Sequence, residues 1–393
     1  MRHPVHLVDM QVVADLPTPA DEAVKPKRLD AFLSQKLRFW SLVAMLMLVY
    51  VHAYNLHPRY LHAASAVEEP LTIGSYLQYF LANGLFRFRI PILFAISGYL
   101  FAFHDSGTPH KVRVQRRVRT LLMPYLIWSF IGLAGTWAME QFPATRQLVQ
   151  AAALSSFGPE NPFVSGYTPG QLLLRWLLVP VPFQLWFLMS LLVYNLAYPW
   201  LRTAVDRAPA VYFVVAGLLW LLGIDIQPFI GGTGLLFFAL GVWLRRRDID
   251  VLRPPRWFPV VPMAVLWLVV LLVKSYLAFH FQSPPFLPML LLHKAAEALG
   301  IGVMWFGSDA VVRVAMSQRW FALVAGFSFM IYVLHVPLVN YATEWALRTW
   351  PGQNLLVFLL LPLLIAGLAV LLGAVMRKLV PGVYGLLTGG RGM

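Results

Sequence analysis

The chain has 393 residues, of which 59% are hydrophobic and only 12% are charged, about half the charged fraction of a typical globular protein. Lys and Arg (31) outnumber Asp and Glu (17), giving a formal charge of +14, but too few polar residues remain to form the surface of a soluble nucleic-acid-binding protein. The absence of cysteine excludes disulfides, thiolate metal sites and a cysteine-linked acyl-enzyme.

Residues 1–36 are polar and mixed in charge, and they contain four prolines. They lack an apolar stretch followed by a small-residue cleavage site, so the pattern is not that of a signal peptide. The composition predicts a disordered cytosolic tail.

From Leu37 onward, long apolar runs alternate with short polar segments, which predicts an all-α, multi-span membrane domain over residues 37–380 and a short cytosolic tail over 381–393. A membrane span needs about 20 predominantly apolar residues. The stretches 74–86 and 171–182 are only partly apolar, and we interpret the first as an interfacial or re-entrant helix. The ten candidate spans are 39–56, 86–103, 120–139, 183–201, 209–224, 229–244, 258–279, 286–307, 321–342 and 354–376.

The basic residues favour a topology with both ends in the cytoplasm. With ten spans and the N-terminus inside, 23 of the 31 Lys and Arg residues fall in cytoplasmic segments, four in external segments and four within spans. This imbalance is what the positive-inside rule expects. Most of the positive charge is therefore interpreted as a topology signal.

Ionisable side chains within spans are functional candidates, because charge is costly in lipid. Lys274 and His280 lie near the outer end of a span and are expected to extend toward the interface. His293 and Glu297 are four residues apart on one predicted helix, so they could form a structural pair or contact a substrate. The full set is His52, Arg87, Arg89, Lys274, His280, His293, Lys294, Glu297 and His335.

His52 is the strongest candidate for a general base. It lies fourteen residues after Arg38, which places it about 21 Å along a helix from the cytoplasmic side. A neutral imidazole can accept a proton near neutral pH. The alternative is an interfacial histidine bonded to a neighbouring helix.

Two further clusters of basic residues suit anions. Arg87 and Arg89 precede a span that contains Pro91, and they could bind a phosphate or a developing thioester oxyanion, or simply extend to the interface. The second is a cluster of basic residues in a predicted cytoplasmic loop. It could bind the phosphates of coenzyme A, or it could only orient the chain and contact anionic lipid. Its members are Lys111, Arg113, Arg116, Arg117 and Arg119.

Five sequence stretches, in order, resemble the acyltransferase family 3 membrane proteins, which include O-acyltransferases of exopolysaccharides, O-antigen and glucans. The resemblance extends over residues 37–340. The stretches are the first span from Leu37-Arg38-Phe39-Trp40 to Val51-His52-Ala53-Tyr54-Asn55, the segment from Arg87-Phe88-Arg89-Ile90-Pro91 to Ile96-Ser97-Gly98-Tyr99, the basic loop leading into Met123-Pro124-Tyr125-Leu126-Ile127-Trp128, the motif Leu185-Trp186-Phe187-Leu188, and Ile331-Tyr332-Val333-Leu334-His335-Val336-Pro337.

The resemblance implies transfer of an acyl group, by family frequency acetyl, from cytoplasmic acetyl-CoA to a sugar hydroxyl of an extracytoplasmic or lipid-linked glycan. It implies a bacterial inner-membrane enzyme whose partners are acyl-CoA, the glycan, the lipid bilayer and polysaccharide-assembly proteins, with no nucleic acid and no metal. Succinyl is an alternative acyl group. The acceptor is not identified by the sequence.

The resemblance assigns catalysis to His52, as the base, and to Arg87. Family members often carry a basic residue eleven positions before this histidine, where the chain has Ser41, so Arg38 is considered a substitute. Arg113, Arg116, Arg117 and Arg119 are the predicted coenzyme A-binding residues. The predicted substrate-binding residues are Arg38, Arg89, Ser97, Tyr99, Trp186, His293, Glu297 and His335.

A transporter or flippase for a lipid-linked or anionic saccharide is the competing interpretation, since it would also use buried charges along a path. Inverted repeats and paired broken helices would favour it, and the sequence shows neither. Acetyl-CoA turnover by the purified protein would separate the two functions.

Overall fold

The computed structural model describes residues 29–103, 109–158, 161–226, 229–281 and 283–392. Within these ranges the chain is almost entirely helical, apart from one short antiparallel hairpin. The elements up to the middle of the chain are α1 (Ala31–His52), α2 (Ile73–Tyr79), the π-helical turn η1 (Phe80–Gly84), the 3-10 turn η2 (Leu85–Phe88), α3 (Arg89–Phe103), α4 (His110–Arg117), the π-helical turn η3 (Val118–Leu122), α5 (Met123–Glu140), α6 (Pro143–Ala152), the 3-10 turn η4 (Val164–Gly166), α7 (Pro169–Leu177), the 3-10 turn η5 (Phe183–Leu185) and α8 (Trp186–Leu196).

The second half contains the hairpin and the longest helices. In the hairpin, Asp225 pairs with Gly231 and Ile226 pairs with Ile230. The elements are α9 (Tyr198–Arg207), α10 (Pro209–Leu221), β1 (Asp225–Ile226), β2 (Ile230–Gly231), α11 (Gly232–Arg246), α12 (Val260–His280), α13 (Phe286–Gly307), α14 (Asp309–Ser317), α15 (Arg319–Ala325), α16 (Ser328–Thr349), α17 (Asn354–Leu379) and α18 (Pro381–Thr388).

The described chain has six helices that are long and apolar enough to cross a membrane, or up to eight if each of two bent helix pairs is one span. The prediction of a helical, multi-span membrane protein is confirmed. The number of ten spans is not confirmed, because α8, with 11 residues, and α11, with 15, are short. Helix α10 reaches spanning length only together with α9, from which it is bent by 117°.

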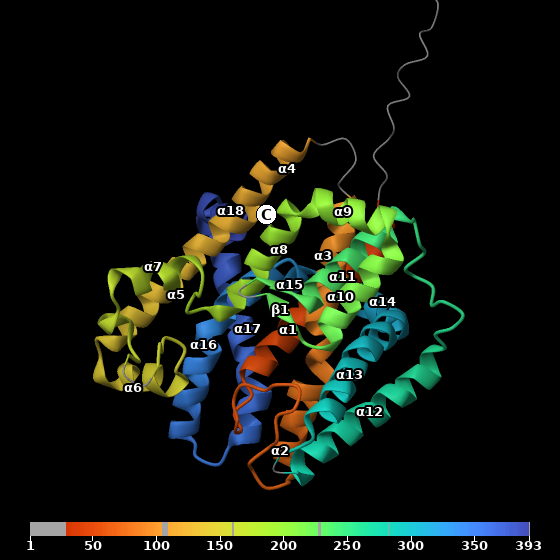
Figure 1. Cartoon of the computed structure of the whole chain (residues 1–393). Helices are drawn as coiled ribbons and strands as arrows, with labels where there is room; N and C mark the ends of the chain where they lie inside the picture. The colour runs from red at the N-terminus through yellow and green to blue at the C-terminus, as the bar shows by residue number, and fades with distance from the viewer. Residues whose placement is uncertain (1–28, 104–108, 159–160, 227–228, 282, 393) are drawn as a thin grey trace, which may run out of the picture.

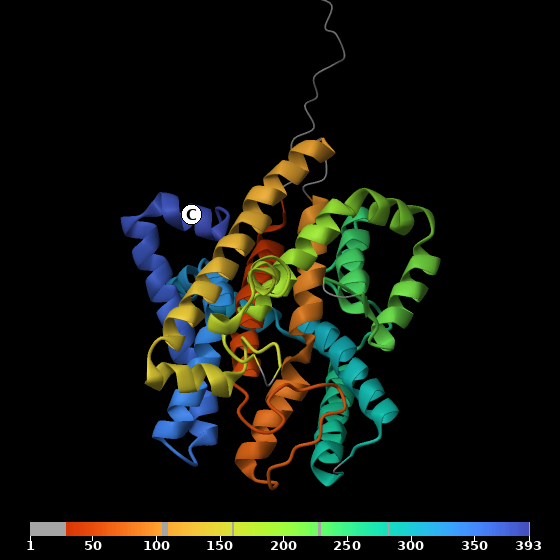
Figure 2. The same cartoon turned by 60° about the vertical axis from the view of Figure 1, so that its left-hand side comes forward.

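Helix α1 lies within the bundle and contacts α3, α14, α16 and α17 (Figures 1 and 2). Its N-cap is Asp30, whose carboxylate accepts a hydrogen bond from the Leu33 amide at 2.9 Å, so the helix begins at Ala31, inside the expected tail. Residues 1–28 of that expected tail lie outside the described residues. Trp40 and Ala44 on this helix are completely or almost completely buried.

The closest helix contact joins α3 and α11 through two glycines. An ideal Cβ on Gly98 would lie 2.0 Å from the Phe238 carbonyl oxygen, and one on Gly241 would lie 2.0 Å from the Ala95 carbonyl oxygen. Small residues of this kind let helix backbones approach closely in membranes. The glycine of the Ile-Ser-Gly-Tyr stretch therefore has a packing role.

Helices α4 and α18 lie near the C-terminus at one end of the bundle, and α2 lies at the opposite end (Figure 1). The expected C-terminal tail, 381–393, contains α18, whose Tyr384 and Leu387 are buried. The Trp128 indole donates a hydrogen bond of 2.9 Å to the Leu387 carbonyl, which attaches α18 to α5.

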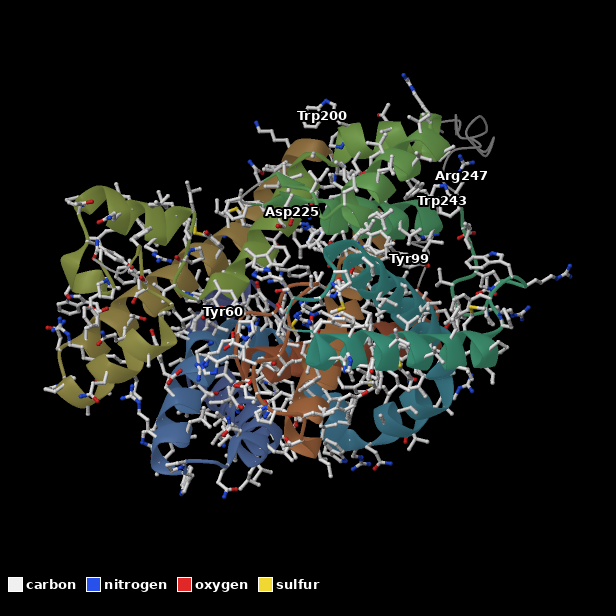
Figure 3. All side chains as sticks on the ribbon, turned by 60° about the horizontal axis from the view of Figure 1, so that its bottom comes forward. Tyr60, Tyr99, Trp200, Asp225, Trp243 and Arg247 are labelled. Atoms are coloured by element: carbon white, nitrogen blue, oxygen red, sulfur yellow. The ribbon has the colours of Figure 1, made fainter. Side chains whose placement is uncertain are left out.

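Between α5 and α8 the chain forms α6, η4 and α7, which pack beside α5 (Figure 2). Glu140 holds this segment by accepting hydrogen bonds from the amides of Val164 (2.8 Å) and Ser165 (2.9 Å). On the outer surface of the bundle many apolar side chains are exposed, among them Trp200, at the top of Figure 3, which is 74% exposed. This is the surface expected of a protein whose solvent is largely lipid.

Candidate active site

Arg87 and Arg89 lie at a break in helix geometry. The chain leaves α2 through a π-helical turn and a 3-10 turn before it enters α3, so one long helical segment, Ile73–Phe103, changes geometry just before the arginines. Such π-helical turns are frequent at functional sites. Arg87 donates a hydrogen bond to the Leu61 carbonyl (3.0 Å), and Arg89 donates one to the Phe86 carbonyl (3.0 Å).

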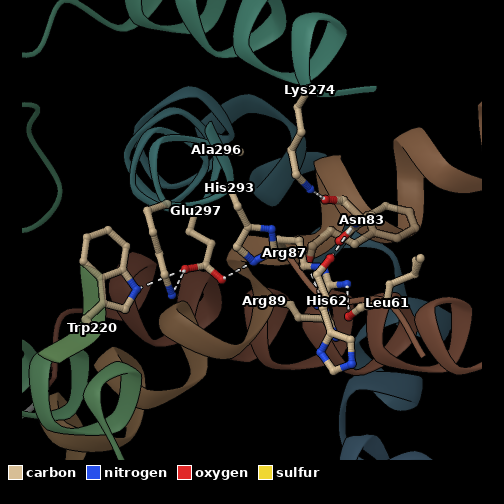
Figure 4. A network of polar contacts seen from close by, with 12 residues as sticks. Leu61, His62, Asn83, Arg87, Arg89, Trp220, Lys274, His293, Ala296 and Glu297 are labelled. Carbon is tan, nitrogen blue, oxygen red and sulfur yellow. Dashed lines mark hydrogen bonds and ion pairs between the residues drawn. The ribbon is translucent and has the colours of Figure 1, made fainter. Parts of the chain in front are cut away.

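Glu297 is the centre of a buried polar network (Figure 4). Its carboxylate lies 3.2 Å from His293 Nε2 and 3.5 Å from Lys294 Nζ, and it accepts a hydrogen bond of 3.0 Å from the Trp220 indole. The structure thus shows the His293–Glu297 pair that the sequence suggested. It also places Glu297 on the wall of a cavity of about 490 Å³, together with Arg87 and Arg89.

Lys274 is also part of this buried region, and the prediction that it extends to the interface is wrong. Its side chain is fully buried and donates a hydrogen bond to the Asn83 carbonyl in the π-helical turn (Figure 4). The altered hydrogen bonding of that turn leaves the carbonyl available, and the lysine also lies over the Tyr79 ring. His280, by contrast, is exposed at the end of α12.

His52 ends α1 between two aromatic rings. The His335 ring stacks on it with a centroid distance of 5.4 Å and an interplanar angle of 25°, and the Phe183 ring meets it edge-on at 4.9 Å and 83°. His335 Nδ1 lies 3.1 Å from the Ile331 carbonyl, so Nδ1 carries the proton in the neutral ring and Nε2 is left as an acceptor. The two neighbours fix the plane of the His52 imidazole.

Helix α16 is interrupted beside this histidine pair. Val336 has non-helical backbone angles because Pro337 follows it, and a proline disfavours the helical conformation of the residue before it. The Gln184 side-chain amide reaches the carbonyls left open at the break and lies 3.0 Å from the Val336 oxygen and 3.2 Å from the Val333 oxygen. In return, the Tyr332 hydroxyl donates a 2.7 Å hydrogen bond to the Gln184 backbone carbonyl.

Three cavities meet at this part of the protein. We call the largest, of about 490 Å³, the arginine cavity, because Arg87, Arg89 and Glu297 line it. The second, of about 380 Å³, is called the C-terminal cavity because Arg391 lines it. Between them lies a space of only about 10 Å³, the histidine cavity, which His52 lines.

The histidine cavity adjoins both larger cavities. It shares Ile90 and Trp186 with the arginine cavity. It shares four residues with the C-terminal cavity, namely Met45, Leu93, Phe187 and Tyr332. His52, the last residue of α1, lines this narrow space between the two larger ones.

The structure brings together most of the predicted substrate-binding residues. Trp186 and Arg89 line the arginine cavity, and Ser97 lines the C-terminal cavity. His335 reaches the site through its stacking on His52, and His293 reaches it through Glu297.

Two predicted substrate-binding residues lie elsewhere. Tyr99 does not line any of the three cavities, and it lies on the side of Trp243 and Arg247 in Figure 3. Arg38 is directed to α15, where it donates a 3.2 Å hydrogen bond to the Ala322 carbonyl. Ser41, at the position where family members often have a basic residue, lines the C-terminal cavity.

Of the four arginines predicted to bind coenzyme A, Arg117 alone lines the C-terminal cavity. Arg116 and Arg119 are exposed, and Arg113 lies over the Tyr198 ring. The helical spacing of the cluster explains the difference, since one face of α4 and η3 turns toward the protein and the other faces outward.

Sequence reasoning missed three polar residues of the site. Asp225 lines the arginine cavity from β1, Gln184 lines the histidine cavity, and Arg391 lines the C-terminal cavity. Asp225 lies between two apolar stretches, which is a weak signal, and the other two have no signal in the local sequence. Within the described ranges, no three His, Cys, Asp or Glu residues cluster as metal ligands.

Comparison with known proteins agrees with the sequence motifs. The family model for the acyltransferase domain of the acyltransferase 3 family matches residues 41–376. The succinoglycan biosynthesis protein ExoH of Rhizobium meliloti (strain 1021) is 28% identical over 377 residues, which cover 92% of this chain and 94% of that protein. No solved structure matches the chain significantly.

Proposed function

Since the chain belongs to the acyltransferase 3 family, we propose that it transfers an acyl group to a sugar hydroxyl of a glycan, with His52 as the general base. The proposed donor is an acyl-CoA and the proposed acyl group is acetyl. A polysaccharide acceptor is supported by the similarity to a protein of succinoglycan biosynthesis.

The observation that carries the proposal is the position of His52 between two cavities. A donor that enters the C-terminal cavity and an acceptor that enters the arginine cavity would approach the same imidazole from opposite sides. Holding two reactants in line in this way supplies much of the acceleration in a transfer reaction. Direct transfer needs no covalent enzyme intermediate, and the chain has no cysteine to form a thioester.

The proposed reaction begins when His52 takes the proton of the acceptor hydroxyl. The oxygen then attacks the thioester carbonyl and forms a tetrahedral oxyanion, which Arg87 or Arg89 stabilises. The carbon–sulfur bond breaks, the acyl–oxygen bond remains, and the thiolate leaves with the proton that His52 returns. Atoms and charges balance without a further reactant.

The arginine cavity suits a sugar acceptor. Trp186 and Phe94 offer aromatic surfaces, and Asp225 and Glu297 offer carboxylate acceptors for sugar hydroxyls. The two arginines supply donors on the same wall. Sites of this type combine apolar walls with a few polar groups that fix the orientation of the ligand.

The proposed location is the bacterial inner membrane, with both chain ends and the C-terminal cavity on the cytoplasmic side. The basic helix α4 and the helix α18 lie at the same end of the molecule (Figure 1). Ten spans, counting the short α8, α10 and α11, give this arrangement with the positive charges inside. Polysaccharide-assembly proteins are proposed as further partners.

The test uses purified full-length protein in nanodiscs with acetyl-CoA and candidate glycans. An acyltransferase releases CoA in step with acetylated glycan, detected by a thiol reagent and by mass spectrometry. A flippase for the same glycan would move it across the bilayer and release no CoA. Comparison of surface glycans from cells with and without the protein would identify the acceptor.

A further inference from the structure

The chain after the family match folds back onto the bundle and completes the wall of the C-terminal cavity. The family model ends at residue 376, but the structure continues through α18. Gly389, with φ of +62°, packs so closely on Thr120 that an added Cβ would lie 2.6 Å from the Thr120 carbonyl oxygen. Arg377 donates a 3.0 Å hydrogen bond to the Gly392 carbonyl, which fixes the end of this segment.

This segment places Arg391 in the cavity. The guanidinium donates hydrogen bonds to the carbonyls of Thr120 (2.7 Å) and Thr388 (3.0 Å), and it lies over the Phe329 ring. Both bonds use one of its terminal nitrogens, so donors remain available to a ligand. Arg117, the last residue of α4, lines the same cavity.

The two arginines have no acidic counterpart in the part of the chain that the structure describes. No Asp or Glu lines the C-terminal cavity, whose polar residues besides the arginines are Ser41, Ser97, Asn195, Ser328 and Tyr332. Burial, together with the charge of Arg117, lowers the pKa of Arg391 to about 10, so its guanidinium stays positive at neutral pH. Partly buried cations without an acidic partner are costly, and an anion that bridged them would relieve that cost.

We propose that Arg391 and Arg117 together bind a phosphate group of the acyl donor. The proposal rests on the proposed function, because it assigns the C-terminal cavity to the donor. Guanidinium groups bind phosphate through paired, charge-assisted hydrogen bonds. A phosphate held by the two arginines would leave the acyl end of the donor free to extend past Phe187 and Tyr332, which line both the C-terminal and the histidine cavity, toward His52.

The first experiment measures CoA binding by calorimetry to full-length protein in nanodiscs. We expect R391Q to weaken CoA binding by about 10-fold or more, the effect of losing a hydrogen bond to a charged group. R391K should recover part of the affinity, and K378Q, which removes an exposed charge from the neighbouring segment, should bind like the wild type. Equal CoA affinity in R391Q and the wild type would overturn the proposal.

A second measurement separates a phosphate site from a structural role, because Arg391 also holds Thr120 and Thr388. Pantetheine has the same thiol arm as CoA without the nucleotide phosphates. Its affinity should be unchanged in R391Q, whereas a collapsed cavity would weaken both ligands equally and refute the phosphate site. In R117Q/R391Q the loss of CoA-binding free energy should be smaller than the sum of the losses in the two single variants, since both residues would hold one phosphate group.

The source of the phosphate is tested by the lipid composition of the nanodisc. If Arg391 binds an anionic lipid headgroup instead, R391Q will bind anionic lipid more weakly than the wild type but will bind CoA equally well. That result would reject the donor site. If the wild-type protein binds CoA through Arg391 but transfers no acyl group, the phosphate site is supported and the proposed function is rejected. Acyl transfer by R391Q with an unchanged KM for the donor would support the proposed function and reject the phosphate site.

Discussion

The imidazole rings of His52 and His335 lie nearly parallel, 5.4 Å apart, although 283 positions separate them in the chain. Their stacking joins the end of α1 to the point where α16 is interrupted. His335 is held through its own hydrogen bond to the Ile331 carbonyl, so the orientation of His52 depends on a residue of another helix. This contact joins the first and the last of the five sequence stretches that resemble the family, since His52 belongs to the first and His335 to the last.

Replacing His52 should abolish transfer without unfolding the protein. A general base contributes about 10²- to 10⁴-fold to the rate, so H52A should lower transfer of labelled acetyl groups in membranes by at least 100-fold. The matched control is H280A, because His280 is exposed at the end of α12. Normal expression of H52A with undiminished transfer would show that another residue is the base.

His335 is expected to position His52 and not to react itself. H335F keeps an aromatic ring beside His52 and should retain more transfer activity than H335A, because the ring plane of His52 stays restrained. The measurement is the transfer rate at saturating substrates across a pH series. If both variants lose activity as completely as H52A, His335 takes part in proton transfer.

Removing the charge of Glu297 should destabilise the protein. In E297Q the buried cation Lys294 loses its carboxylate partner, and breaking a buried pair in this way costs about 3–5 kcal/mol. Thermal unfolding followed by tryptophan fluorescence should show a clearly lower Tm. E68Q, at an exposed position, is the control, and E297Q with K294M should recover part of the stability. An unchanged Tm in E297Q would contradict this account of the network.

The glycine contact between α3 and α11 should tolerate no side chain. In G98A the added methyl group would clash with the Phe238 carbonyl and force the helices apart, which costs about 1–3 kcal/mol or more. Lower yield of monodisperse protein and a lower Tm are expected. G217A, where a Cβ would meet no atom within 4 Å, should behave like the wild type, and equal behaviour of G98A would show that the helices can separate freely.

The Gln184 amide should be required for the shape of α16. In Q184E the side chain has no N–H to donate, so the carbonyls of Val333 and Val336 lose their partner at a cost of about 1–3 kcal/mol. A lower Tm and a lower transfer rate are expected together. Q318E changes an exposed glutamine in the same way and should alter neither quantity.

The membrane class and several ionisable residues that line the cavities could be predicted from the sequence because they depend on local signals. Long apolar runs predict helices that cross a membrane, and charges inside such runs mark His52, Arg87 and Glu297. The number of spans could not be fixed in the same way. Hydropathy does not distinguish a full span from short or bent helices such as α8 and α10.

The rest of the site depends on contacts between distant parts of the chain. Lys274 looks like an interfacial residue in its own helix, and only the π-helical turn at Asn83 provides the carbonyl that holds it. Arg391 falls in the predicted short cytosolic tail, and only the return of α18 to the bundle places it in a cavity. Neither relationship has a signature in the local sequence.

The occupation of the α16 break by Gln184 has a consequence for water. An interrupted helix in a membrane normally recruits water to its open carbonyls, but here a side-chain amide takes that place. The space around His52 measures about 10 Å³, the smallest volume that admits a water molecule. In the proposed reaction, so narrow a space would limit the water that reaches His52 once donor and acceptor fill the neighbouring cavities, which would slow hydrolysis of the donor thioester.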